Sequence, residues 1–142
     1  MIAVATKALI VRDQEILRIW KSDAEAAGSI APDERWDLPG GRLLLGESPT
    51  DSLRREVLEE TALEVEVLGP AFVWHRYFEQ RQFQLVGITF VCRHVRGEVR
   101  LSPEHSDFRW VRLSSFPVAD WSESELVLAS VRRYLPAATC AG

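Results

Sequence analysis

Three glutamates at helical spacing, Glu56, Glu59 and Glu60, are the feature that most constrains this chain. On a helix, positions i, i+3 and i+4 share one stripe, so the three carboxylates would face the same way. Like charges placed in this way cost about 0.2–0.5 kcal/mol per pair in an isolated helix. The clustering becomes favourable when a hard divalent cation such as Mg²⁺ or Mn²⁺ lies among oxygen ligands. The alternative is a solvated acidic face, because short glutamate clusters are common on helices.

The residues before the glutamates predict a capped helix. Ser48 is a suitable N-cap, Pro49 suits the first helical position, and Asp51 completes a capping box. Leu53 and Val57 share the other side of this helix and are expected to pack against a sheet. The acidic stripe is therefore expected to face away from the core.

A glycine pair precedes this helix. Gly40 and Gly41 follow Pro39 and indicate a tight bend, where the backbone can approach a ligand closely. Arg55 lies one turn before Glu59 and is expected to hold that carboxylate in position. The alternative for Arg55 is an ordinary surface ion pair, which contributes a few tenths of a kcal/mol.

The spacing of these residues resembles the Nudix box, which is glycine, five residues, glutamate, seven residues, Arg-Glu, an aliphatic residue, any residue, Glu-Glu, any residue, glycine and an aliphatic residue. The match begins at Gly41, passes through Glu47, and differs at one defined position, where Ala62 replaces the family glycine. The lead-in 36–41 (W-D-L-P-G-G) also resembles the family. The family glycine lies where a left-handed residue is often needed, so Ala62 predicts a slightly different exit from the helix.

The resemblance implies a MutT-like Nudix hydrolase with an α/β fold, in which a mixed β-sheet is sandwiched between α-helices. Nudix enzymes hydrolyse a nucleoside diphosphate linked to another group, with Mg²⁺ or Mn²⁺. By position, Glu56, Glu59 and Glu60 would bind the metal, and the Gly40 carbonyl would be an additional ligand. Glu47 would support the geometry of the loop and helix. The residue that accepts the proton of water varies in the family, so no single base is assigned.

A second acidic segment, residues 103–111, resembles a downstream Nudix element in which an acidic loop precedes a strand with a tryptophan. Glu104 is the first candidate for an extra metal ligand or base, and His105 and Asp107 rank behind it. The alternative is a polar turn followed by a strand whose Trp110 packs in the core. For His105 taken alone, this structural alternative is preferred.

Substrate residues are expected where aromatic and basic side chains meet, because a base needs an apolar slot and phosphates need cations. Trp74 and Tyr77 are candidates for stacking on a base, and Arg76 for contacting a phosphate. For Trp74 taken singly, the alternative role of a core anchor is preferred. Arg35 and Arg42 flank the glycine pair and are candidate phosphate contacts. A (deoxy)nucleoside triphosphate or similar small nucleotide is favoured, while ADP-ribose, nucleotide sugars and dinucleoside polyphosphates stay open.

Length and charge limit the other function classes. The 142 residues fit one domain, expected over residues 1–136, with a disordered tail at 137–142. A net charge of −4 argues against a nucleic-acid partner. No apolar segment is long enough to span a membrane, and cytoplasm is the default location. Whether the protein forms a homodimer is left open, since the sequence shows no interface. The alternative functions are a non-catalytic binding or regulatory Nudix domain, and a scaffold protein with a solvated acidic helix.

The periodicity of apolar residues predicts the remaining elements. Strands are expected at 3–11, 16–21, 42–45, 63–74, 83–94, 98–101 and 108–112. A long loop is expected at 22–35. A second helix is expected at 122–135, with an inner face formed by Leu126, Val127, Ala129, Ser130 and Val131. Strands separated by two helices favour an α/β sandwich.

Overall fold

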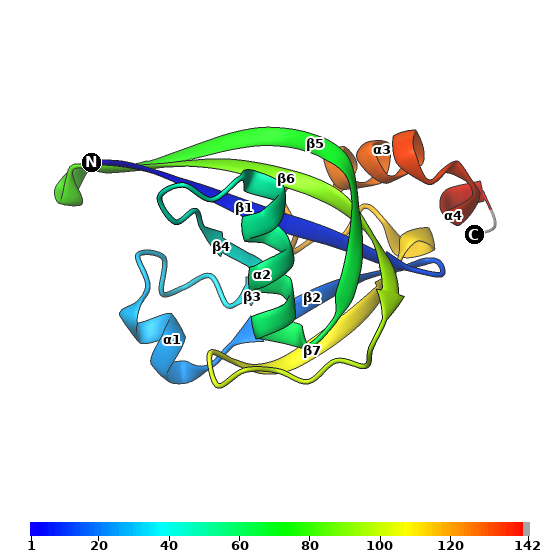
Figure 1. The fold of residues 1–142 in the computed structure, drawn as a ribbon, viewed down its shortest axis with the longest axis horizontal. Helices are drawn as coiled ribbons and strands as arrows, with labels where there is room; N and C mark the ends of the chain where they lie inside the picture. The colour runs from blue at the N-terminus through cyan, green and yellow to red at the C-terminus, as the bar shows by residue number, and fades with distance from the viewer. Residues whose placement is uncertain (141–142) are drawn as a thin grey trace.

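The computed structural model describes residues 1–140, which form a mixed seven-stranded sheet with helices on both faces (Figure 1). The strands are β1 (Ile2–Arg12), β2 (Glu15–Lys21), β3 (Trp36–Asp37), β4 (Gly40–Arg42), β5 (Glu64–Phe78), β6 (Phe83–Arg96) and β7 (His105–Arg112). The helices are α1 (Asp23–Gly28), α2 (Pro49–Thr61), α3 (Ser124–Tyr134) and α4 (Pro136–Cys140). This confirms the predicted α/β class and the sheet between helices.

The sheet opens into two parts beyond its first hairpin. Strands β1 and β2 pair only beside their turn, at Val11 with Ile16 and at Arg12 with Glu15. Beyond that point β1 continues with β4 and, in parallel, with β6, which pairs with β5. Strand β2 instead continues with β3 and β7. The segment from β3 to β4, which carries the glycine pair, therefore connects the two parts.

Strand β1 supplies both faces of the core, because its successive side chains point to opposite sides. Helix α2 covers one face, as Figure 1 shows, and α3 packs on the other. The cluster under α2 includes Ala8, Ile10, Leu53 and Val57. The cluster under α3 includes Leu9, Val11, Val127 and Val131. The helix that carries the glutamates is thus fixed to the centre of the sheet by its apolar side.

Helix α2 begins as the sequence predicts. Ser48 is the N-cap, and its hydroxyl accepts a hydrogen bond from the Asp51 N–H at 3.2 Å, with Pro49 in the first turn. Leu53 and Val57 are fully buried, as expected.

The predicted change of exit at the end of α2 is wrong. Ala62 itself takes the left-handed conformation, with φ 63° and ψ 14°, and its N–H donates to the Leu58 carbonyl at 2.9 Å. The Leu63 N–H also donates to the Thr61 hydroxyl, at 3.3 Å. These bonds hold the turn in the geometry that glycine would give it.

Several predicted element bounds differ from the structure. The 22–35 segment contains α1, which Ser22 caps by accepting from the Glu25 N–H at 3.1 Å. The short strand expected at 42–45 is β4, at Gly40–Arg42. In the second helix Val127, Ser130 and Val131 are buried, whereas Leu126 and Ala129 are exposed. The expected tail begins with α4, and residues 141 and 142 lie outside the described residues.

The strand predicted at 98–101 does not form. Instead, the N–H groups of Arg100 and Ser102 donate to the carbonyls of Thr61 and Glu60, at 2.9 and 3.2 Å. The last carbonyls of a helix have no partner within it, so this segment satisfies them. The end of α2 is thereby joined to the loop before β7. No helix in residues 1–140 is long and apolar enough to cross a membrane.

Candidate active site

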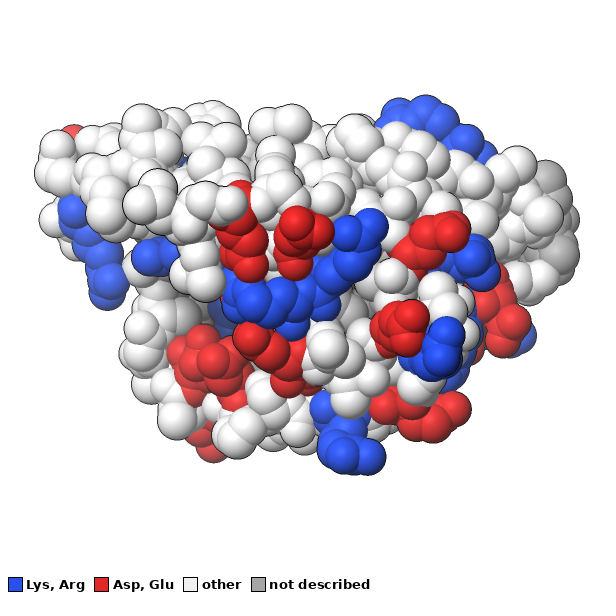
Figure 2. Space-filling model, in the orientation of Figure 1, with Lys and Arg blue, Asp and Glu red and all other residues white. Residues whose placement is uncertain are grey.

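Arg55 connects the glycine loop to the carboxylates of α2. Its Nε and Nη2 donate to the two oxygens of Glu47 at 2.7 and 3.0 Å, and its Nη1 donates to Glu56 at 3.1 Å and to Glu59 at 3.3 Å. The hydrogen bond from Arg55 lowers the pKa of Glu47 to about 2. Figure 2 shows acidic and basic side chains intermixed at the centre of the face that carries α2. Glu47 is therefore the main partner of Arg55, and Glu59 is a weaker one.

Glu56 lies against the glycine loop. A Cβ on Gly41 would stand 2.7 Å from the Glu56 carboxyl carbon, so only glycine lets the loop backbone approach this carboxylate. Gly40 has φ 147°, and a Cβ there would collide with the Thr6 carbonyl oxygen. Burial raises the pKa of Glu56, against the opposing effect of Arg55. The two glycines thus determine how closely the loop and α2 pack.

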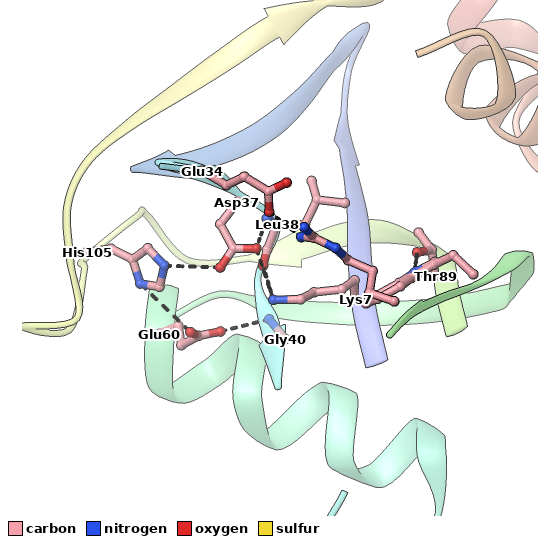
Figure 3. A network of polar contacts seen from close by, with 10 residues as sticks. Lys7, Glu34, Asp37, Leu38, Gly40, Glu60, Thr89 and His105 are labelled. Carbon is pink, nitrogen blue, oxygen red and sulfur yellow. Dashed lines mark hydrogen bonds and ion pairs between the residues drawn. The ribbon is translucent and has the colours of Figure 1, made fainter. Parts of the chain in front are cut away.

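Glu60 is the most buried of the three, with 7% of its side chain exposed. Its Oε1 accepts a hydrogen bond from the Gly40 N–H at 2.7 Å (Figure 3). Burial raises the pKa of Glu60 to about 8, although the charge of Lys7 and the Gly40 hydrogen bond act in the opposite direction. A carboxyl group whose charged form is disfavoured by burial keeps its proton to a higher pH, and a cation placed nearby would favour the charged form.

Lys7 and Asp37 form an ion pair beside Glu60 that the sequence did not identify as part of the site. Lys7 Nζ donates to Asp37 Oδ1 at 3.0 Å and to the Leu38 carbonyl at 3.3 Å. Burial alone would raise the pKa of Asp37, but the Lys7 charge, the neighbouring His105 ring and the hydrogen bond from Lys7 hold it well below its usual range. Its position in the sequence could have indicated that Asp37 belongs to the site, because Asp37 immediately precedes the Leu-Pro-Gly-Gly turn.

The loop before β7 reaches the same place. One oxygen each of Glu60 and Glu104 and one nitrogen of His105 all lie within 4.8 Å of one another. Glu104 is exposed, whereas the His105 side chain is only 2% exposed. Asp107 is exposed and accepts from the Phe108 N–H at 2.8 Å. The structure therefore brings Glu104 and His105, the first residue of β7, to α2, whereas Asp107 lies further along β7 and is exposed.

A cavity of about 950 Å³ lies between the two parts of the sheet. Of the predicted substrate residues, Arg35, Trp74 and Arg76 line it. Arg42 and Tyr77 are not among its lining residues. The Arg42 guanidinium lies over the Phe83 ring, 4.6 Å from its centroid, and the Tyr77 hydroxyl is 3.1 Å from Gln82 Nε2. Lys7 and Asp37 also line the cavity and connect it to the carboxylates.

Other aromatic residues in the cavity wall were not among the predicted substrate residues. Trp20 and Trp36 pack edge to face with ring centroids 4.9 Å apart. The buried Arg18 lies between Trp36 and Trp121, at 5.0 and 4.6 Å from their centroids, and its Nη1 donates to Asp120 at 3.1 Å. Only Trp36 belongs to a motif noted in the sequence, and these side chains meet only after β2 and β3 pair.

Comparison with known proteins adds a family match. The model of the NUDIX domain matches residues 1–130. The chain is 31% identical over 110 residues to a "MutT-like protein" of Streptomyces ambofaciens, covering 77% of this chain and 63% of that protein. It is 33% identical over 118 residues to the "Oxidized purine nucleoside triphosphate hydrolase" of Mus musculus, covering 81% of this chain and 69% of that protein. The crystal structure of a MutT NUDIX hydrolase from Burkholderia pseudomallei superposes with a TM-score of 0.73 at 25% identity, covering 92% of this chain and 98% of that one.

Proposed function

Because the chain belongs to the NUDIX domain family, we propose that it is a metal-dependent hydrolase that cleaves a pyrophosphate bond in a small nucleotide. The observation that carries this proposal is the convergence of Glu56 and Glu60 on the Gly40–Gly41 loop, with Glu59 joined to Glu56 through Arg55, next to a cavity of nucleotide size. A (deoxy)nucleoside triphosphate is the preferred substrate class. A non-catalytic nucleotide-binding or regulatory domain is the alternative.

The proposed metal ligands are Glu56, Glu59, Glu60 and the Gly40 carbonyl. The set suits Mg²⁺ or Mn²⁺, because these ions prefer oxygen ligands. The environment of Glu60 also fits this role. Burial disfavours the charged form of its carboxyl group, and a bound cation would favour that form. When bound, Mg²⁺ or Mn²⁺ would offset the charge of the diphosphate and lower the pKa of an attacking water.

The protein's own groups position the reactants. Arg55 holds Glu56 and Glu59 through one guanidinium nitrogen while its other two nitrogens are fixed by Glu47. The proton of the attacking water needs a carboxylate acceptor within hydrogen-bond reach. Glu104 is one candidate for this base, because it is exposed at the edge of the carboxylate group. The α2 glutamates are the others.

The cavity is suited to a nucleotide. Its volume falls within the range of roughly 300–1,000 Å³ of small-molecule sites, which are lined by apolar and aromatic groups with a few polar ones. Trp20 and Trp74 offer aromatic surface for a base, and Arg35 and Arg76 offer positive charge for phosphates. The name of the mouse relative supports a nucleoside triphosphate as the substrate class.

The test is a phosphate-release screen over nucleoside triphosphates, nucleotide sugars, ADP-ribose and dinucleoside polyphosphates. Each substrate is assayed with Mg²⁺, with Mn²⁺ and with chelator. We expect metal-dependent cleavage of nucleoside triphosphates, abolished by chelator. Cleavage confined to another class would replace the proposed substrate. Nucleotide binding without cleavage of any class would favour the non-catalytic alternative.

A further inference from the structure

His105 is a buried histidine with no hydrogen-bond partner among the described residues. Both of its ring nitrogens are inaccessible to solvent, and neither makes a hydrogen bond within residues 1–140. Most buried polar side-chain atoms in proteins have at least one partner, and leaving one without a partner costs about 1–3 kcal/mol. We therefore expect a bound ligand to supply the missing partner of this ring.

The ring lies between two carboxylates (Figure 3). Its Nε2 is 3.6 Å from Asp37 Oδ2, and its Nδ1 is 3.8 Å from Glu60 Oε2. Asp37 is an ionised acceptor, because Lys7 holds it in an ion pair. A neutral imidazole has one N–H and one lone pair. With the N–H directed at Asp37, the lone pair of Nδ1 faces a Glu60 oxygen 3.8 Å away, which is too far for a hydrogen bond between them.

We propose that a divalent transition-metal ion binds between this nitrogen and this oxygen, with His105 Nδ1, Glu60 and Glu104 as ligands. The 3.8 Å separation of Nδ1 and the Glu60 oxygen is compatible with two ligands of one ion at about 2.0–2.2 Å each. Glu104 is exposed and free to turn toward the ion. The inference rests on the proposed function, since Glu60 is also one of its proposed metal ligands.

Asp37 supports this assignment from the other side of the ring. Histidines that bind metals almost always donate their second N–H to a carboxylate or carbonyl, which fixes the tautomer and the orientation of the ring. Asp37 is placed for this contact, and it is itself held by Lys7 and by the Leu38 N–H at 2.8 Å. An imidazole ligand also suits transition metals better than Mg²⁺, which takes oxygen ligands. The loop before β7 would thus give the site a metal preference that the α2 glutamates alone do not.

The test uses Mn²⁺ alone, without nucleotide, and reads its ligands by pulsed electron paramagnetic resonance. We expect ¹⁴N coupling from one imidazole in the wild-type protein. His105→Asn should abolish the coupling and weaken Mn²⁺ binding by at least about 10-fold. The matched control is His75→Gln, which changes an exposed histidine on β5 outside the cavity wall and should leave both readouts unchanged. Circular dichroism verifies that each variant is folded.

Two results would overturn the proposal: Mn²⁺ bound to wild-type protein without imidazole coupling, or coupling that persists in folded His105→Asn. The wild-type spectrum alone shows whether an imidazole binds Mn²⁺, even if the His105→Asn variant does not fold. The metal measurement is also separable from the hydrolysis screen. Imidazole coupling without hydrolysis would support the His105 metal site and contradict the proposed hydrolase activity. Hydrolysis without imidazole coupling would support the activity and contradict the metal site.

Discussion

Ala62 shows how one residue departs from its family pattern without changing the backbone. Its φ of 63° is a conformation that costs an L-residue with a Cβ about 1–2 kcal/mol relative to the right-handed region. Glycine adopts it without this cost, although glycine also has more freedom to lose on folding. The residue is therefore a local source of strain that substitution should relieve.

Ala62→Gly is expected to raise the free energy of unfolding by about 0.5–1 kcal/mol, because relief of the left-handed strain exceeds the entropy that glycine adds to the unfolded chain. Urea denaturation of the wild-type and variant proteins measures the difference. A variant equal to or less stable than the wild type would mean that Ala62 is not strained.

At the same scale, the sequence predicts which residues bear charge but not how deeply each lies. Helical spacing placed Glu56, Glu59 and Glu60 on one stripe, yet the fold buries Glu60 and leaves Glu59 at the surface. The difference arises from the loop segments that pack over one end of α2. For the same reason the sequence favoured a simple structural role for His105, whose surroundings come from three separate parts of the chain.

Helix α2 is the element on which the site depends, and its apolar side can be tested separately from its acidic side. Leu53 is fully buried in the core cluster under the helix, whereas Leu58 is 58% exposed on the same helix. Leu53→Ala is expected to cost about 2–5 kcal/mol of stability. Leu58→Ala, the matched control, should change stability by less than about 0.5 kcal/mol. Chemical denaturation of the two variants measures both; equal losses would contradict the packing described for α2.

Sequence periodicity predicted the long elements because their apolar patterns extend over many residues. It placed β1, β2, β5, β6 and the start of α2 within a few residues of their positions. It failed for 98–101, where backbone groups bond to the end of α2 instead of to a strand. It also missed the cavity, because the separation of β1 from β2 depends on pairings distant in sequence.

The stability of the whole molecule should depend on pH through Glu60. Burial raises the pKa of this group from 4.5 to about 8, so between these values the native protein holds a proton that the unfolded chain has released. Stability is lost with rising pH wherever the native state binds more protons. The contribution of Glu60 is therefore fully present below pH 4.5 and is lost progressively up to about pH 8.

In chelator, the unfolding free energy of the wild type relative to Glu60→Gln is expected to fall as pH rises from 5 to 8. Mn²⁺ takes the place of the proton, so it should stabilise the wild type more at pH 8 than at pH 6. Urea denaturation at several pH values, with and without Mn²⁺, tests both statements. A difference between the two proteins that stays constant with pH would contradict the pKa assigned to Glu60.

The most direct test of the account is the turnover of Glu60→Gln, measured with Mg²⁺ on the substrate identified by the screen. Glutamine keeps an oxygen that can accept from the Gly40 N–H, so the fold should be retained while the negative charge is lost. Turnover is expected to fall by about 10²–10⁴-fold. Glu98→Gln is the matched control, because that glutamate is 94% exposed and is not among the residues that line the cavity; it should retain full activity. A folded Glu60→Gln protein with near-normal turnover would contradict the central role given to the α2 carboxylates.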